Sequence, residues 1–282
     1  MVNILKVKSD RRTLAGLIVA ISVQIFCIVN FSLNWTALPY LLIFAVAGFW
    51  ASTANHMHQH LPIFHSDLLN QALNLILSVM FGAPATRLHI VHLWNHHAHF
   101  NADDFESSDW SHHNLAGNSR GIFRAVKYVA AASVLMAKNR SQINVPAASQ
   151  KLLVRERFFL WLVAAVLIYQ LPYVFFILIL PGWILSLSLL LTANLINHDY
   201  CQTNSDLHHS RDFLSHAENF LFLNSGYHSA HHRLPAKHWS DLPHVHLTHF
   251  KDKKIQIEHS FFLYFLQNYF FSTRKGQNES GV

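Results

Sequence analysis

Charge is scarce in this chain. Only 13% of its 282 residues are Asp, Glu, Lys or Arg, about half of the roughly 25% found in an ordinary soluble domain. Residues 13–55 and 158–197 contain no Lys, Arg, Asp, Glu or His. Each of these blocks is about twice as long as the roughly 20 residues that cross a bilayer core. Each block therefore predicts two membrane-spanning helices joined by a turn, which excludes an ordinary soluble protein.

Cysteine and several cofactor motifs are also missing. Cys27 and Cys201 are the only cysteines, too few for a disulfide framework or an iron–sulfur cluster. The chain has neither a Gly-x-Gly-x-x-Gly dinucleotide fingerprint nor a His-Pro-Gly-Gly haem signature. None of its five glutamates has a histidine three residues later, which excludes the Glu-x-x-His pairs of soluble di-iron bundles.

The two apolar blocks define the expected fold. The first turn is expected around Ser32–Pro39, where polar residues and a proline interrupt the apolar run. Gln170–Pro172 and Pro181–Gly182 are both candidates for the second turn. We expect an all-α integral membrane fold, with four transmembrane helices in two hairpins and a helical cytoplasmic cap.

Basic residues set the expected orientation. All 21 Lys and Arg precede residue 13, lie within 56–157 or follow residue 197. Two hairpins would place these three segments on one side of the membrane, and their positive charge marks that side as cytoplasmic. Both termini should then be cytoplasmic, and the basic surface would suit an anionic inner leaflet. Nucleic-acid binding is a poor interpretation, because the basic residues are dispersed and accompany membrane spans.

The expected organisation is a single membrane domain over residues 1–271. Its spans lie within 13–55 and 158–197, and its cap consists of residues 56–157 and 198–271. The polar tail 272–282 is expected to be disordered.

Histidine is unusually abundant. None of the 23 histidines lies in either apolar block. Eight of them form three groups at helical spacing: His56 and His60; His92, His96 and His97; and His228, His231 and His232. Residues three or four apart share one face of a helix, and neutral imidazole is a good ligand for iron, copper and zinc. Eight histidines exceed what one four-coordinate zinc ion uses, so the pattern favours two metal ions.

This layout resembles the membrane fatty-acid desaturase and hydroxylase superfamily, whose members carry three histidine boxes after paired transmembrane helices. The matching boxes are His56-Met-His-Gln-His60, His92-Leu-Trp-Asn-His-His97 and His228-Ser-Ala-His-His232. The resemblance covers roughly residues 13–250. The sequence around the third box, from Asn224 to Pro243, is similar to that of bacterial acyl desaturases and implies a bacterial inner membrane.

The resemblance implies further site residues. His198, in Asn194-Leu-Ile-Asn-His198, would be a ninth metal ligand, and Asn194 would contact the metal through water. His209 competes for the ninth place. Apart from the resemblance, the spacing of His99 from His96 and the position of Asp103 after the second box predict contacts with ligand histidines rather than with the metal. Met57 stands where many relatives have an acidic residue, so the effect of that position on the ligand histidines should differ from theirs.

The resemblance also implies a reaction. Two ferrous ions and dioxygen would attack an unactivated C–H bond of a fatty acyl chain, and the expected product is a double bond. The metal ligands would be the catalytic residues, with no separate catalytic side chain. Electrons would come from a separate ferredoxin, rubredoxin or cytochrome-type donor with its reductase, because the chain contains no redox domain of its own. Membrane lipid surrounds the spans.

Other activities fit the same pattern. A hydroxylase, a carotenoid ketolase and a fatty-acid decarboxylase that forms terminal alkenes would share the boxes. A membrane zinc hydrolase would need fewer histidines and an acidic base beside them. A metal-binding or transport protein should carry ionisable ligands at membrane depth, and both apolar blocks lack them.

Overall fold

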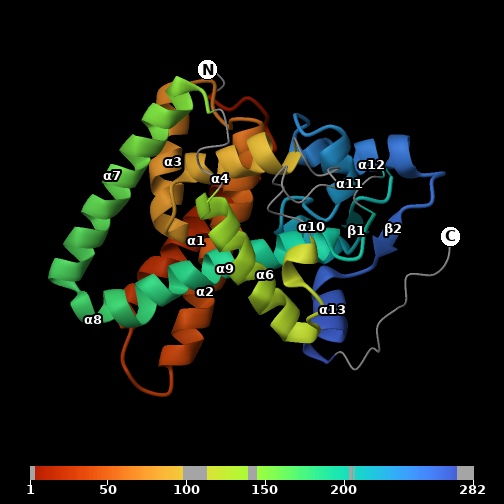
Figure 1. The fold of residues 1–282 in the computed structure, drawn as a ribbon. Coiled ribbons are helices and arrows are strands. Elements are labelled where there is room, and N and C mark those ends of the chain that lie inside the picture. Colours follow the sequence, from red (N-terminus) through yellow and green to blue (C-terminus); the bar gives the residue numbers. More distant parts are fainter. Residues whose placement is uncertain (1–3, 98–112, 139–144, 203–204, 206, 272–282) are drawn as a thin grey trace.

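The computed structural model describes residues 4–97, 113–138, 145–202, 205 and 207–271. His99, Asp103 and the tail 272–282 therefore lie outside the described residues. The described chain is predominantly helical (Figure 1). Its α-helices are Asp10–Asn30 (α1), Ala37–His60 (α2), Asp67–Phe81 (α3), Ala85–Val91 (α4), Gly121–Lys138 (α6), Ala147–Gln170 (α7), Pro172–Val174 (α8), Leu180–His198 (α9), His216–Leu221 (α10), His228–Arg233 (α11), Leu242–Phe250 (α12) and Phe261–Phe265 (α13).

Shorter elements connect these helices. Three segments are π-helical: His92–His96 (η1), Phe175–Ile179 (η5) and Leu266–Phe270 (η7). Two are 3₁₀ turns, His113–Ala116 (η3) and Trp239–Asp241 (η6). Strands β1 (Arg211–Phe213) and β2 (Gln256–Glu258) pair in parallel, with Arg211 opposite Gln256 and Phe213 opposite Glu258.

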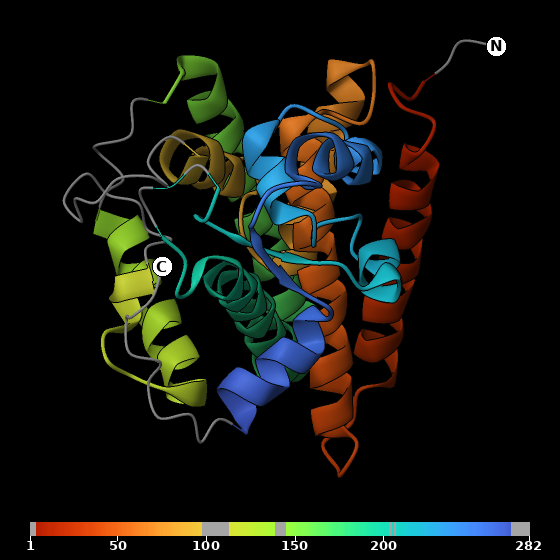
Figure 2. The ribbon, with the colours of Figure 1, turned by 90° about the vertical axis from the view of Figure 1, so that its right-hand side faces the viewer.

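Helices α1 and α2 form the first predicted hairpin. They lie side by side (Figure 2) and are each long and apolar enough to cross a membrane. The connection is a tight turn in which the Asn34 side chain accepts a hydrogen bond from the Thr36 backbone N–H at 2.8 Å. The turn lies inside the predicted interval Ser32–Pro39, which confirms this part of the sequence prediction.

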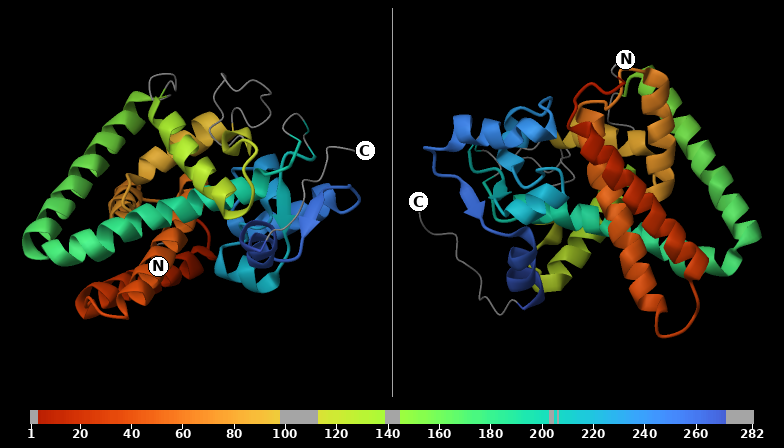
Figure 3. Two further views of the ribbon diagram at one scale, coloured as in Figure 1. Left: turned by 60° about the horizontal axis from the view of Figure 1, so that its bottom comes forward. Right: turned by 180° about the vertical axis from the view of Figure 1, so that it is seen from behind.

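The second apolar block breaks at Leu171. This residue lies between α7 and α8 with φ −138° and ψ 52°, because the proline that follows disfavours helical geometry at the residue before it. The turn is therefore at the first of the two predicted positions, and Pro181 lies inside α9. From this apex, α7 and α9 diverge as the two arms of a V (Figure 3).

The described residues contain three helices that could span a membrane by length and apolarity, namely α1, α2 and the continuous segment Pro172–His198. Helix α7 is not among them, since Arg155, Glu156 and Arg157 interrupt it. A fourth candidate is the pair Asp67–Phe81 and Ala85–His96, which is bent by 90°. The protein is thus a helical membrane protein, and the expected arrangement of four spans in two hairpins stays a prediction.

Glycine makes the bend between α3 and α4 possible. Gly82 ends α3 in the left-handed region, with φ 76°, a conformation that side chains with a Cβ disfavour. A Cβ here would also lie 2.2 Å from the Trp183 side chain of α9. The bend directs α4 away from the axis of α3 and back toward the end of α2.

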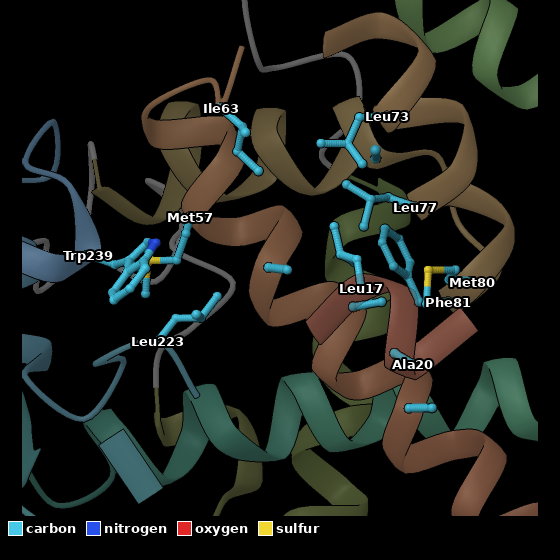
Figure 4. Close-up of a cluster of buried hydrophobic side chains, with 14 of the residues drawn as sticks. Leu17, Ala20, Met57, Ile63, Leu73, Leu77, Met80, Phe81, Leu223 and Trp239 are labelled. Atoms are coloured by element: carbon cyan, nitrogen blue, oxygen red, sulfur yellow. The ribbon is translucent and has the colours of Figure 1, made fainter. Parts of the chain in front are cut away.

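A buried apolar cluster joins the membrane helices to the segments after α10 (Figure 4). It packs Leu17 and Ala20 of α1, Met57 of α2, and Leu73, Leu77, Met80 and Phe81 of α3 with Leu223 and Trp239. Met57 therefore lies in this core, where an acidic side chain in its place would be costly to bury.

A buried ion pair joins α6 to the end of α9. The Arg124 guanidinium donates through Nε and Nη2 to the Asp199 carboxylate at 2.6–3.1 Å, and the Tyr269 hydroxyl donates to the same carboxylate. Asp199 is fully buried and Arg124 nearly so. Because Asp199 directly follows His198, this pair fixes the helix end that carries a predicted ligand.

Replacing Arg124 by Met should strongly destabilise the protein, since it leaves the buried Asp199 carboxylate without its cation. Loss of one partner of a buried pair costs about 3–5 kcal/mol. Thermal unfolding in detergent should show a clear fall in Tm. The exposed Arg120→Met is the matched control and should change stability by no more than about 0.5 kcal/mol. Equal Tm values for the two variants would show that the pair contributes nothing.

Candidate metal centre

The last turn of α2 carries the first pair of histidines. His56 and His60 are one turn apart, with ring centroids separated by 5.0 Å. The His56 Nε2 atom lies 3.1 Å from Nε2 of His231, which comes from α11. His58, between them, faces elsewhere and accepts a hydrogen bond from the Ile63 backbone N–H. The i, i+4 spacing thus places two imidazoles on one face, as predicted.

The second box lies on a π-helical turn, which the sequence did not indicate. The His97 backbone N–H bonds to the His92 carbonyl, five residues back. This register brings His92 and His97 together, with their Nε2 atoms 2.9 Å apart. The wider turn therefore aims both residues at one region, which α-helical spacing of five residues would not do.

A carboxylate fixes the start of the helix that leads into the second box. Glu156 of α7 is buried and accepts hydrogen bonds from the Thr86 backbone N–H at 2.8 Å and from the Thr86 hydroxyl at 2.6 Å. The first N–H groups of a helix have no partner within it, so Glu156 satisfies one of them at the start of α4. This residue positions the second box without touching it.

The third box lies on α11 and meets the end of α9. His228, His231 and His232 are all buried. The His228 Nε2 atom lies 2.9 Å from His198 Nε2 and 3.2 Å from His232 Nε2. His198, at the last position of α9, is thus next to the third box in space although 30 residues separate it from His228 in sequence.

The imidazoles form two groups, each capable of holding one metal ion. Within each group the potential ligand atoms lie within 4.8 Å of one another. The first group, which we call group one, contains His56, His60, His92 and His231; group two contains His96, His198, His228 and His232.

His97 lies between the two groups. Its Nε2 atom is 3.1 Å from Nε2 of His231 in group one, and its ring centroid is 4.6 Å from that of His232 in group two. The structure therefore brings together all nine histidines that were predicted as ligands.

The geometry fits metal ions. The His198 Nδ1 atom lies 2.9 Å from the His209 carbonyl oxygen and must donate to it. In neutral His198 the Nε2 atom then carries a lone pair, and it faces His228 Nε2 at 2.9 Å. Several imidazole nitrogens that converge in this way are well placed to share a cation. Fixing one ring nitrogen by a hydrogen bond while the other points at the metal is the usual arrangement of a ligand histidine.

The protonation states agree with this interpretation. Burial and, to a smaller extent, neighbouring histidines hold the pKa values of His228, His231 and His232 well below 6.5. Burial and the neighbouring His96 likewise lower the pKa of His97. Neutral imidazole is the form that binds metal.

Nitrogen is the only donor in either group of described residues, since neither contains a Cys or a carboxylate. Such a donor set suits iron, copper or zinc rather than magnesium or calcium.

The other predicted site residues have different positions. The His209 ring lies beside group two, 5.0 Å from the His232 ring, but His209 is not one of the four. Its Nδ1 atom lies 3.1 Å from the Ser205 carbonyl oxygen. The Asn194 amide donates to the Tyr128 hydroxyl at 3.0 Å. His99 and Asp103 lie outside the described residues.

Sequence reasoning missed the groups that hold the ligand-bearing helices. Glu156 and Asp199 looked like ordinary charges near span ends, and Arg211 and Asp212 carried no motif. One available signal was their position, because Asp199 directly follows a predicted ligand and Glu156 lies two residues before the second apolar block.

A helical membrane protein with two adjacent imidazole groups, one buried and the other half-buried, has the donor set of a membrane metalloprotein. Residues 33–258 match the profile of the fatty acid desaturase family. The chain therefore belongs to this family, which confirms the resemblance stated from the histidine boxes. No curated protein and no solved structure matches the chain.

The metal-free protein should lose stability below neutral pH. The folded-state pKa values of His228, His231 and His232 are lowered, so below about pH 6.5 the unfolded chain binds protons that the folded protein does not. Stability is then present above pH 6.5 and falls as pH decreases, by up to about 1.4 kcal/mol per histidine and pH unit.

Thermal unfolding of chelator-treated protein in detergent checks this expectation. Tm should be lower at about pH 5.5 than at about pH 7.5. His232→Asn should reduce the difference, whereas the exposed His244→Asn should leave it unchanged. The same Tm at both pH values would contradict the assignment of neutral, buried imidazoles.

Proposed function

We propose that this protein is a dioxygen-dependent di-iron oxidoreductase that forms a double bond in a fatty acyl chain. The observation that carries the proposal is the pair of adjacent, all-nitrogen groups with His97 between them. Two sites so close suit a metal pair that acts on one substrate. Membership of the fatty acid desaturase family supports the choice of iron and of an acyl substrate.

Bound in the two groups, iron would supply the activation of dioxygen and the removal of hydrogen from the acyl chain. The overall reaction removes two hydrogens from adjacent carbons, and dioxygen becomes two waters with two electrons and two protons from outside. The described chain offers no redox group of its own, so these electrons would come from a separate ferredoxin, rubredoxin or cytochrome-type donor and its reductase.

The side chains contribute ligation, orientation and exclusion of water. His96 is fully buried, and His231 is only 2% exposed. The hydrogen bond from His198 Nδ1 to the His209 carbonyl fixes the ring orientation and the tautomer. No described residue among the boxes is placed as an acid, base or nucleophile, so the nine histidines carry the chemistry as ligands.

The proposed arrangement in the membrane follows the charge distribution. Residues 1–271 would form one domain with four spans, and both termini and both imidazole groups would face the cytoplasm. The ends of α2 and α9, which carry His60 and His198, are both the C-terminal ends of candidate spans. Their proximity supports a common side for the three histidine boxes.

Metal analysis tests the centre. Anaerobically purified protein should contain about two iron ions per chain, and His96→Ala should lower the iron content and abolish activity, since His96 belongs to group two. His244→Ala is the matched control, because His244 is exposed and belongs to neither group. One tightly bound zinc ion and no iron would instead favour a hydrolase.

Product analysis tests the reaction. Cells that express the chain with a suitable reductase and electron donor should accumulate new double bonds in their fatty acids, detected by mass spectrometry. The His96→Ala protein should yield none. New hydroxyl groups, ketocarotenoids or terminal alkenes would identify one of the related reactions, and an unchanged profile with verified electron supply would refute an acyl substrate.

A further inference from the structure

Four consecutive residues contact the ends of two ligand-bearing helices. They are His209, Ser210, Arg211 and Asp212, which lie at and just before β1, and all four are buried. Of the four, only His209 was singled out from the sequence, as an alternative ligand. Their contacts go either to the end of α9, which carries His198, or to the start of α11, which carries the third box.

Two of the four residues hold the end of α9. The His209 carbonyl accepts the hydrogen bond from His198 Nδ1 at 2.9 Å. The Arg211 guanidinium donates through Nη1 to the carbonyl oxygens of Ile196 and Asp199, at 3.0 and 3.2 Å. The last carbonyls of a helix have no partner within it and carry partial negative charge, so a buried cation is favourable there.

The other two residues hold the start of α11. The Asp212 carboxylate accepts a hydrogen bond from the Ser229 backbone N–H at 2.6 Å, and its second oxygen accepts from His246 Nδ1 at 2.8 Å. The hydroxyls of Ser210 and Ser229 are 3.0 Å apart. Ser229 directly follows His228, so these contacts fix the backbone beside a predicted ligand.

The four residues are themselves held in place. Arg211 donates through Nη2 to the Gln256 side chain of β2 at 2.8 Å, and its guanidinium lies 4.4 Å from the centroid of the Tyr264 ring. The Phe213 backbone N–H donates to the Gly226 carbonyl. A segment fixed on both sides can transmit a definite spacing, whereas a mobile loop could not.

We propose that residues His209–Asp212 are a positioning element that sets the distance between His198 and the third box. The proposal rests on the metal centre assigned above. Arg211 orients only His198, which belongs to group two. Asp212 orients α11, which supplies His228 and His232 to group two and His231 to group one. The two neighbouring residues therefore have different consequences for the two metal sites.

The test measures ferrous iron binding under anaerobic conditions by competition with a chelator. Removing a hydrogen-bond partner of a metal ligand typically lowers the metal affinity by about tenfold to a hundredfold. Arg211→Met should lower the affinity for one of the two iron ions by this factor and leave the affinity for the other unchanged. Asp212→Ala should weaken both. Asp212→Asn, which keeps an acceptor for the Ser229 N–H, should bind both ions more tightly than Asp212→Ala.

Glu218→Gln is the matched control. The Glu218 carboxylate accepts hydrogen bonds from the Ser260 hydroxyl and from the backbone N–H groups of Phe261 and Phe262. It therefore holds the start of α13, a helix without a ligand histidine. Glu218→Gln should bind two iron ions as the wild type does, even if its metal-free Tm falls.

Several results would overturn the proposal. Wild-type affinity for both ions in Arg211→Met and Asp212→Ala would refute it, as would an equal loss in Glu218→Gln. If Arg211→Met does not fold, Arg211→Lys, which retains the charge but not the planar fork, should still weaken one ion selectively. A wild-type protein that binds no pair of iron ions would refute the proposed function, and the positioning role with it.

Discussion

The structure depends on the approach of nine imidazole rings at close range. Nine rings from α2, α9, α11 and the second box form two adjacent groups with His97 between them, and within each group the ligand atoms lie within 4.8 Å of one another. Without a cation, these ring nitrogens have mainly one another as partners, and the burial of group two restricts hydrogen bonding to water. The surrounding protein must therefore hold the helices in place through other contacts. Most of the buried polar contacts described above serve this purpose.

Charged and polar groups at helix ends do this work. Glu156 holds the start of α4, Arg124 and Asp199 join α6 to the end of α9, and Asp212 holds the start of α11. Glu156 and Asp212 each accept a hydrogen bond from a backbone N–H that has no partner within its own helix. Apolar packing, as in the cluster around Leu77 and Met57, brings the helices together but does not by itself fix where each one ends. The position of a ligand on the last turn is set by the polar contacts.

Much of the site was predictable because it depends on local spacing. The i, i+3 and i+4 separations place His56 with His60, and the charge-free block ending at residue 197 places His198 at a helix end. The first turn was predictable for the same reason, since Asn34 and Pro39 interrupt the apolar run. These features depend on residues close together in the sequence.

Features that depend on contacts distant in sequence were not predictable. The break at Leu171 was one of two possibilities, because a proline can end a helix or be accommodated within it, as Pro181 is. The 90° bend after α3 depends on Gly82 fitting against Trp183, about a hundred residues away. The π-helical register of the second box was not predictable either, because the spacing of His92, His96 and His97 alone suggests an ordinary α-helix.

The π-helical turn makes the second box sensitive to chain length rather than to residue identity. One residue more or less rotates everything beyond it by about 100° around the helix axis. If the same residues formed a regular α-helix, every ligand type would be kept, yet five α-helical steps would turn His97 away from the face of His92. A catalogue of substitutions would miss this constraint, because the element that must be preserved there is an interval of backbone.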